Sequence, residues 1–493
     1  MDKSKILPSS DRKGWIIIMD IRKYLKKLGY DTIPSSYNSK INEWESWYRA
    51  NVRNFHRYSI HNGKNSIRCT RMSLGMAKKV SEDMADLLLN EKVSIKISDD
   101  KSDIFVDQVL KSNNFLVTGN DYQERKCYTG TVAYIPYLSD LSVDEEGNIE
   151  SGAIKINYVS AGNIFPLTWE NGYISECAFV FPKTIAGKKY AHIQVHTIET
   201  ENEGSQYVIY NHIVECTAGS GRELSADEIS EMKVFQNLAL RVQTGSDKRQ
   251  FVIDRLNITN NIDEDNPMGI ALFANAIDQL KGCDITYDSY INEFVLGRKR
   301  IFVAPDMLSS PELGDPVFDP NDAVFYQLPE EYTKKNGEKP IVEVNMALRA
   351  EEHSKGVDDN IKLVSFKCGF GTERYRFDKG TITTATEVIS SNSDMYRTIK
   401  KHEIILNDVL IELIQIIIRL GNVLHYELNE EADINIDFDD SIIEDTEKER
   451  ENDRKDIAFG AFTVEEYRAR WRNESIEEAR KKVITEEENP DEE

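Results

Sequence analysis

The sequence NPMGIALFANAIDQLKGCDITYDSYINEF (266–294) is the stretch that decides the fold, and it runs directly into VLGRKRIFVAPDML (295–308). The first part has the signals of a long helix. Asn266 can cap its start, and Pro267 suits the first helical position, where its missing N–H costs nothing. Gly297 can end the helix in a left-handed cap. Apolar residues recur at spacings of three and four, interrupted only by Asp284: Ile270, Phe273, Ile277, Leu280, Tyr287, Ile291 and Phe294.

From this pattern alone, the stretch is interpreted as a long core helix, about 43 Å at 1.5 Å per residue, followed by a β-hairpin. A second helix is predicted at about 344–366. A third is predicted from about 384 to 420, with a break at 390–394, and it should be buried on most sides because 404–420 is rich in Ile and Leu. Between these two helices, 368–383 has the glycines and threonines of a loop.

Upstream, helices are predicted at 14–28, 39–58, 71–89 and 102–111. The third should bury the face formed by Met76, Val80, Met84 and Leu87. An antiparallel meander is predicted at about 130–217, where Val-, Ile- and Tyr-rich segments are separated by turn residues. A half-buried strand is predicted at 434–438. The fold class is therefore α+β.

Composition limits the classes of function. The chain has 493 residues and a net charge of −24, of which −15 lies from Glu427 onward, with 25 acidic and 10 basic residues. A protein that grips DNA by neutralising phosphates should instead be basic. No apolar run is long enough to span a bilayer. The six cysteines are scattered singly, which favours a reducing cytoplasm and argues against a disulfide framework or a zinc site.

Motifs for catalysis or cofactor binding fail in the sequence. There is no P-loop, and Gly219-Ser220-Gly221 lacks the preceding glycine of a nucleophile elbow. An EF-hand loop beginning at Asp433 would need glycine where Phe438 stands. We therefore predict no catalytic residue, no cofactor and no bound metal, and hence no enzyme.

Three segments together carry a resemblance to a known family: 266–303, with its long helix running into GRKRIFV; TATEVISSNSDMYRTIKKHE (384–403); and MAKKVSEDMADLLLNEKVSI (76–95). The chain resembles the portal proteins of tailed bacteriophages, of the type common in phages of Gram-positive hosts. Their order and spacing extend the resemblance over most of the chain. Two alternatives remain: another structural head component, such as a scaffold or minor capsid protein, or a metal-dependent enzyme acting on nucleic acid.

The resemblance implies a portal fold with an α/β wing (1–265), a two-helix stem (266–297 and 344–367), a small α/β clip (298–343), a tunnel loop (368–383), a long tunnel helix returning to the wing (384–446) and a helical, acidic crown (447–493). It implies a dodecameric ring at the head vertex of the virion, assembled in the host cytoplasm. Double-stranded DNA would pass through the ring without sequence-specific binding. The implied partners are the packaging ATPase (terminase), head-completion or adaptor proteins, scaffold and major capsid protein, with no membrane.

Particular residues receive roles from this resemblance. The basic residues of the tunnel loop would face the passing DNA, those of the clip would dock the packaging motor, and the apolar residues of the first stem helix would hold the stem together. The tunnel-loop residues are Arg374, Arg376 and Lys379; the clip residues are Lys334, Lys335 and Lys339; and the stem residues are Ile277, Leu280, Tyr287 and Ile291.

Overall fold

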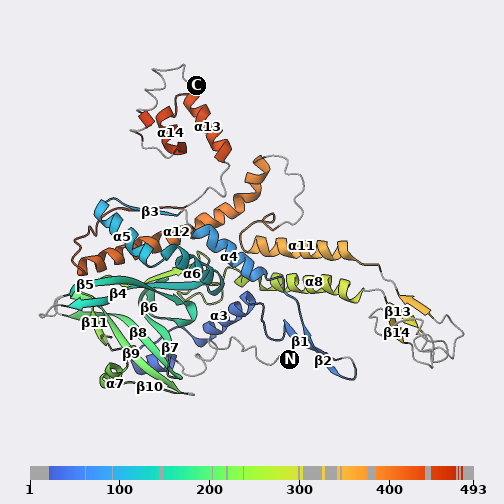
Figure 1. Cartoon of the computed structure of the whole chain (residues 1–493), viewed down its shortest axis with the longest axis horizontal. Coiled ribbons are helices and arrows are strands. Elements are labelled where there is room, and N and C mark those ends of the chain that lie inside the picture. The colour runs from blue at the N-terminus through green and yellow to red at the C-terminus, as the bar shows by residue number, and fades with distance from the viewer. Residues whose placement is uncertain are drawn as a thin grey trace, which may run out of the picture.

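The protein consists of a mixed helix-and-sheet body from which two paired helices project, with a small sheet at their far end (Figure 1). The computed structural model describes residues 21–61, 63–90, 93–143, 149–201, 204–217, 220–236, 238–297, 300–303, 325–327, 341–344, 347–375, 385–438 and 446–472, together with 476, 479 and 480. Its helix and strand content is compatible with the predicted α+β class.

The N-terminal half of the body is helical. Its helices are α2 (Ile21–Lys27), α3 (Ser35–Tyr48), α4 (Met76–Leu88), α5 (Asp100–Ser112) and α6 (Phe115–Thr129). The predicted face of α4 is confirmed, since Met76, Val80, Met84 and Leu87 are all buried. Helix α6 was not predicted. Its sequence is largely polar, and several of its polar side chains are buried among partners that only the folded chain supplies.

A hairpin stands where the sequence predicted the end of a helix. Helix α3 ends at Tyr48, and the predicted continuation to Tyr58 is wrong. Ala50 and Asn54 have positive φ angles of 47° and 64°, so the chain turns twice and then forms β1 (Arg57–His61) and β2 (Ser66–Thr70). The apolar spacing of three and four that suggested one helix continues across these turns because the loop also faces the core.

The strands predicted as an antiparallel meander at about 130–217 are antiparallel to their neighbours, but they are divided between two sheets. Strands β4 (Thr131–Val143) and β5 (Ile149–Ser160) form a sheet with β12 (Val252–Arg255), in the order β12-β4-β5. A short 3-10 turn, η1 (Ala161–Asn163), separates β5 from the second sheet. That sheet has the order β10-β9-β8-β7-β6, with β11 also paired to β9: β6 (Ile164–Glu170), β7 (Tyr173–Ile185), β8 (Lys188–Glu201), β9 (Gly204–Thr217), β10 (Ser220–Glu223) and β11 (Arg241–Gln243).

Short elements cover the large sheet and the edge of the body. Tyr24 and Leu25 of α2 pack on Phe165, Val180 and Ile193 of the large sheet. Helix α7 (Ala226–Glu231) packs on the opposite face of this sheet, where its Ile229 clusters with Tyr190 and Ile213. Strand β3 (Ser94–Ile97) pairs with β16 (Ile434–Asp437), which confirms the strand predicted at 434–438.

The projecting arm consists of α8 (Ile277–Leu296) and α11 (Ala350–Lys367), and we call this helix pair the arm. The predicted helix start at Pro267 is wrong, since α8 begins ten residues later, after a 3-10 turn, η2 (Ala274–Ala276). Asn266 instead accepts a hydrogen bond from the Met268 amide (3.0 Å) in a local turn. Gly297 has φ −76°, so the left-handed cap is also wrong.

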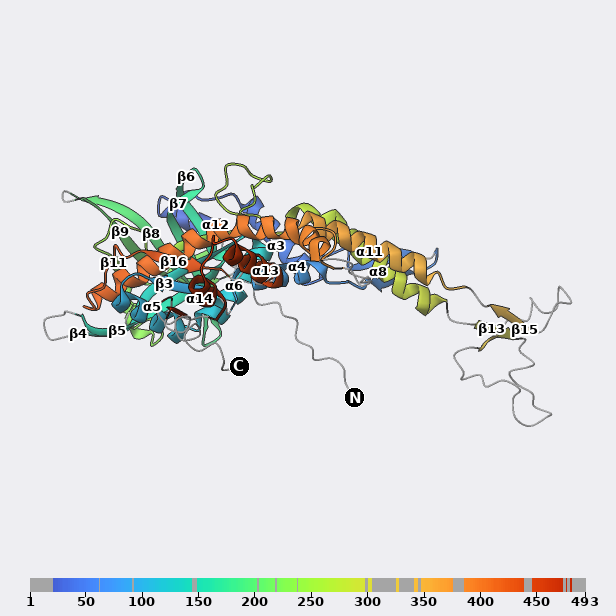
Figure 2. The same ribbon diagram turned by 90° about the horizontal axis from the view of Figure 1, so that it is seen from above.

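A small sheet lies at the far end of the arm, with β13 (Arg300–Val303) between β14 (Phe325–Gln327) and β15 (Ile341–Val344). Strand β14 is parallel to β13 and β15 is antiparallel to it. Figures 1 and 2 both show this sheet beyond the ends of α8 and α11, away from the body.

Helix α12 (Ala385–Val423) is a continuous helix of 39 residues, so the predicted break at 390–394 is wrong. It crosses the body in both views and packs on β12, β4, α4 and α5. Its second half is buried on most sides, as predicted, through Leu406, Leu410, Leu413 and Ile417. The described chain ends in two short helices, α13 (Thr446–Ala458) and α14 (Val464–Arg472).

Candidate functional site

The two helices of the arm run antiparallel and approach each other closely through small residues. A Cβ atom on Gly282 would lie 2.3 Å from Asn360 Oδ1, so α11 occupies the space that any larger side chain would need. One turn further out, a Cβ on Gly356 would lie 3.9 Å from Thr286 Cγ2. These contacts bring the two backbones together without a large apolar interface, and fit a pair of helices whose outer faces remain exposed.

The predicted stem residues have different environments. Leu280 is buried, whereas Ile277, Tyr287 and Ile291 are half-buried on the same helix. On the facing helix, the buried side chains are Val357, Ile361, Val364 and Ser365. Ile270 and Phe273, which the helical spacing had placed on the same stripe, are buried in the core of the body and precede α8.

Asp284 anchors the arm to the body. It is buried on α8, and its Oδ1 accepts hydrogen bonds from Ser73 Oγ (2.9 Å) and from the Leu74 amide (2.8 Å). Its Oδ2 lies 3.0 Å from His56 Nε2. Because His56 Nδ1 accepts from the Val52 amide (2.9 Å), the proton of the neutral ring is on Nε2 and is donated to Asp284. One carboxylate therefore joins α8 to the segment before β1 and to the segment after β2.

An ion pair fixes the two helices to each other at the far end of the arm. The Arg349 guanidinium donates to both oxygens of Glu293, at 3.1 and 2.8 Å, and the Arg349 amide donates to Oε1 at 3.1 Å. These side-chain and backbone hydrogen bonds lower the pKa of Glu293 to about 2. The pair fixes the antiparallel register at the point where the chain leaves α8 for the small sheet.

The segment after α11 turns back toward α12. Gly369 has φ +83°, and a Cβ there would lie 2.6 Å from Thr398 Cγ2, so the turn requires glycine on both counts. Cys368 and Phe370 are buried beside it. Arg374 is exposed. The other predicted basic residues, Arg376 and Lys379 in the tunnel loop and Lys334, Lys335 and Lys339 in the clip, lie outside the described residues.

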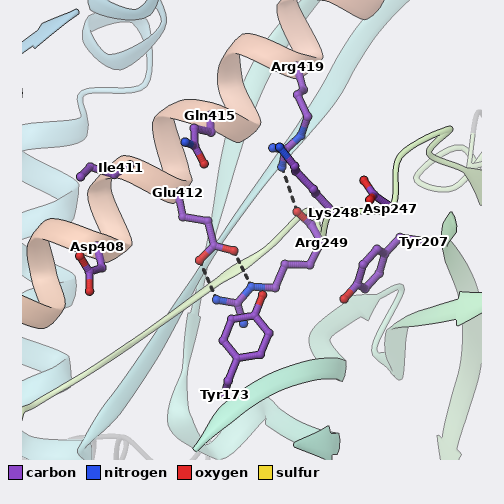
Figure 3. Close-up of a pocket in the computed structure, with 10 residues that line it drawn as sticks. All are labelled: Tyr173, Tyr207, Asp247, Lys248, Arg249, Asp408, Ile411, Glu412, Gln415 and Arg419. Atoms are coloured by element: carbon purple, nitrogen blue, oxygen red, sulfur yellow. Dashed lines mark hydrogen bonds and ion pairs between the residues drawn. The ribbon is translucent and has the colours of Figure 1, made fainter. Parts of the chain in front are cut away.

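An open polar pocket of about 390 Å³ lies between the large sheet and α12 (Figure 3). Arg249 crosses it and donates from Nε and Nη2 to the two oxygens of Glu412 on α12, both at 2.6 Å. Its guanidinium lies 4.1 Å from the centroid of the Tyr173 ring. Burial alone would lower the pKa of Arg249, but the hydrogen bonds and charge of Glu412 raise it above its ordinary value. The arrangement ties α12 to the sheet.

A fully buried polar cluster joins α6 to β12, the strand on which α12 packs. Lys126 Nζ donates to both oxygens of Asp254, at 2.9 and 3.1 Å, and Gln123 donates to the same carboxylate at 2.6 Å. His402 lies on α12, and its Nδ1 accepts a hydrogen bond from the Asn257 amide (3.1 Å), which follows β12. Burial lowers the pKa of His402 to about 3, so this imidazole is neutral at physiological pH.

These buried polar contacts were not predicted from the sequence, and only Asp284 left a visible sign in it. Asp284 was visible as the acidic residue that interrupts an apolar stripe, which is the expected sign of a buried, partnered carboxylate. The partners of Arg249 and Lys126 are 163 and 128 positions away, and no local pattern connects them. Within the described residues, no group of three or more His, Cys, Asp or Glu side chains is placed to hold a metal ion. Nor is any described helix long and apolar enough to cross a membrane.

The chain thus combines a paired-helix arm, a small terminal sheet and a long helix that crosses the body. A family model for phage portal proteins matches residues 33–456, most of the chain, and the chain therefore belongs to that family. The matching family is described as "Phage portal protein, SPP1 Gp6-like". A comparison with curated proteins found no match. The family predicted from the resemblance, the phage portal proteins, is thus confirmed.

Proposed function

We propose that copies of this chain form a closed ring at one vertex of the phage head and that double-stranded DNA is packaged and ejected through its centre. The observation that carries the proposal is the arm. Its two helices bury one face against each other and leave apolar side chains such as Ile285, Leu363 and Phe366 exposed in the single chain. Surfaces of this kind are expected to be covered by neighbouring copies.

In this proposal the body is the wing, the arm is the stem and the small sheet belongs to the clip. Residues 368–383 form the tunnel loop, α12 is the tunnel helix, and α13 and α14 belong to the crown. The ring is dodecameric in the virion and assembles in the host cytoplasm. Its role is structural rather than catalytic, and its partners include the scaffold, the major capsid protein and the head-completion proteins.

Electron microscopy and native mass spectrometry of the purified protein test the ring. We expect closed rings with an open channel at micromolar protein concentration and near-physiological salt. Monomers as the only species would contradict the proposal, and metal-dependent cleavage of DNA by the isolated protein would favour an enzyme instead.

We further propose that 298–343 docks the packaging ATPase through Lys334, Lys335 and Lys339. Reversing these three charges should leave the rings intact and impair motor binding, because the docking surface would change sign. Unchanged stimulation of the ATPase and unchanged packaging would remove the assignment.

Arg374, Arg376 and Lys379 are proposed to face the DNA in the tunnel. Each contact is exposed, screened by salt and independent of base sequence, which suits DNA that must move. Ring assembly of the Arg374→Glu, Arg376→Glu variant should be near normal, whereas its packaging or retention of DNA should be altered. Normal packaging by the variant ring would refute the role of this loop.

A further inference from the structure

The β1–β2 hairpin has two chemically different faces. In its antiparallel register, Ile60 pairs with Ile67 and Tyr58 pairs with Cys69, so these four side chains share one face. The alternate positions form the other face, which is polar and basic: Arg57, Ser59, His61, Ser66, Arg68 and Thr70. We call these the apolar face and the basic face of the hairpin.

The outer half of the apolar face is uncovered in the single chain. Ile60 is 50% exposed and Ile67 is 48% exposed, although they lie directly opposite each other in the ladder. Among the described strands, β1 and β2 pair only with each other. An isolated two-stranded hairpin is marginally stable in water, so this one gains most from a surface that covers its apolar face.

The hairpin and the segments that flank it are basic, in a protein that is acidic as a whole. Residues 51–81 contain seven basic residues and no acidic one, whereas the whole chain carries a net charge of −24. The basic residues are Arg53, Arg57, Lys64, Arg68, Arg71, Lys78 and Lys79. Lys78 and Lys79 lie on α4 and pair with Glu124 and Asp83, so the charge of the hairpin itself comes from Arg57, Lys64 and Arg68. A partner that matches the hairpin therefore offers apolar side chains beside acidic ones.

The end of the arm offers such a surface. Phe294, Val295, Leu296 and Leu348 are 40%, 45%, 63% and 48% exposed. They lie around the tip of the arm, since successive helical side chains point about 100° apart, and we call them the arm-tip patch. Leu348 lies against the end of α8, since a Cβ on Gly297 would be 2.5 Å from its Cδ2. Two exposed glutamates, Glu351 and Glu352, follow in the first turn of α11.

We propose that the hairpin of one copy packs on the arm-tip patch of the neighbouring copy, with its apolar face on the patch and its basic residues near Glu351 and Glu352. The inference rests on the proposed ring and specifies one of its contacts. The base of the hairpin is held to α8 by the hydrogen bond from the Met72 amide to Asp288 (3.0 Å). From there the hairpin projects beside α8 toward the same end of the molecule as β13 (Figure 1).

The geometry favours a neighbouring copy over the other occupants. Within one chain the hairpin and the arm-tip patch are both exposed, so they do not cover each other. A patch that binds a different patch on the next copy forms a head-to-tail contact, which closes into a ring by rotation. DNA would engage the basic face but would leave Ile60 and Ile67 in water, because its phosphates offer no apolar surface.

Disulfide crosslinking in the full chain tests the contact. We would place Ile60→Cys and Leu296→Cys together in a Cys69→Ser background, which removes the nearest native thiol. Mild oxidation of assembled rings should give a ladder of covalent oligomers up to the ring size. The matched control combines Ile60→Cys with Ile104→Cys, an equally exposed position on α5, and should give no ladder.

A second variant measures the energetic contribution. Ile60→Ser with Ile67→Ser should raise the protein concentration at which rings half-form by at least about ten-fold, since both side chains lose apolar burial in every contact. The control, Ser59→Ala with Thr70→Ala on the basic face, should leave assembly unchanged.

The outcomes separate this contact from the ring itself. If the wild-type chain forms rings, but the Ile60→Cys, Leu296→Cys variant gives no ladder and the serine variant assembles normally, the contact is overturned and the ring stands. Wild-type chains that form no rings would overturn both. Normal rings of the serine variant together with loss of DNA affinity in an Arg57→Ser, Arg68→Ser variant would assign the hairpin to DNA and also overturn the proposal.

Discussion

Replacing Asp284 with alanine should release the arm from the body. The change removes the acceptor of three hydrogen bonds, from His56 Nε2, Ser73 Oγ and the Leu74 amide. A hydrogen bond to a charged group contributes about 1.5–3 kcal/mol, and donors left buried without an acceptor cost a similar amount. Since the Ser73 hydroxyl can rotate to other acceptors, we expect a loss of about 3–5 kcal/mol in local stability.

The conservative variant Asp284→Asn should not restore this stability fully. Its carboxamide oxygen can still accept from Leu74, but its NH2 group then faces the Nε2 proton of His56. The imidazole cannot change tautomer to relieve this, because its Nδ1 already accepts from the Val52 amide. One unpaired donor should cost about 1–3 kcal/mol.

Hydrogen exchange of the intact protein measures the effect at the Leu74 amide. A loss of about 3 kcal/mol corresponds to exchange at least about a hundred-fold faster in Asp284→Ala. The control is Asp278→Ala, one side of an exposed pair with Lys281 on the same helix, which should change stability by less than about 0.5 kcal/mol. Equal exchange at Leu74 in the two alanine variants would refute the view that this carboxylate anchors the arm.

Three further outcomes are expected. Gly282→Leu should destabilise the arm by about 1–3 kcal/mol in urea unfolding, because the side chain would overlap Asn360; an unchanged midpoint would contradict the close approach. Burial lowers the pKa of His196 to about 3, so below pH 6.5 the unfolded chain binds a proton that the folded chain does not. As the pH falls from 6.5 to 5, this group should lower the free energy of unfolding by up to about 1.4 kcal/mol per pH unit. His196→Leu should therefore reduce the dependence of stability on pH in this range, while the buried His402 keeps its own contribution; an unchanged dependence would be inconsistent with this expectation. Arg249→Ala should cost about 3 kcal/mol by leaving its carboxylate partner on α12 without its ion pair, whereas the exposed neighbour Lys248→Ala should be nearly neutral in the same assay.

The elements that could be predicted from sequence are those whose pattern and burial agree. Helix α4 shows its buried face at regular spacing, and the second half of α12 is so apolar that few environments suit it. The strand at 434–438 alternates apolar and acidic residues, as a half-buried strand should. In these segments local preference and tertiary contacts favour the same structure.

The failures have a common physical cause. The start of α8 was misplaced because Asn266 and Pro267 suit a turn as well as a helix, and because Ile270 and Phe273 are apolar for the sake of the body's core. Helix α6 was missed because two of its buried side chains, Gln123 and Lys126, are polar. Both donate hydrogen bonds to the carboxylate of Asp254, which lies far along the chain. Spacing along a sequence cannot distinguish such cases, since both depend on contacts between distant segments.

For the site, the sequence predicted the paired helices of the arm but not what fixes them. The burial of Leu280 was expected from the apolar spacing, whereas the ion pair between Glu293 and Arg349 was not predicted. A helix surface carries many charged residues, and which two of them meet depends on the register of the pair. The roles of Arg374 and of the basic residues at 334–339 and 376–379 remain predictions.

The close approaches along the arm have a consequence for how such a chain can diverge. Gly282 faces Asn360, Thr286 faces Gly356 and Glu293 pairs with Arg349. The two residue numbers have the same sum in each pair, so the antiparallel register is constant along the arm. A single-residue deletion within α8 would rotate everything beyond it by about 100° and separate each later pair. An insertion between Glu293 and Arg349 leaves all these partners in register. The intervening segment is therefore the place where chain length can change at little cost to the arm, so relatives of different length can share one helical scaffold.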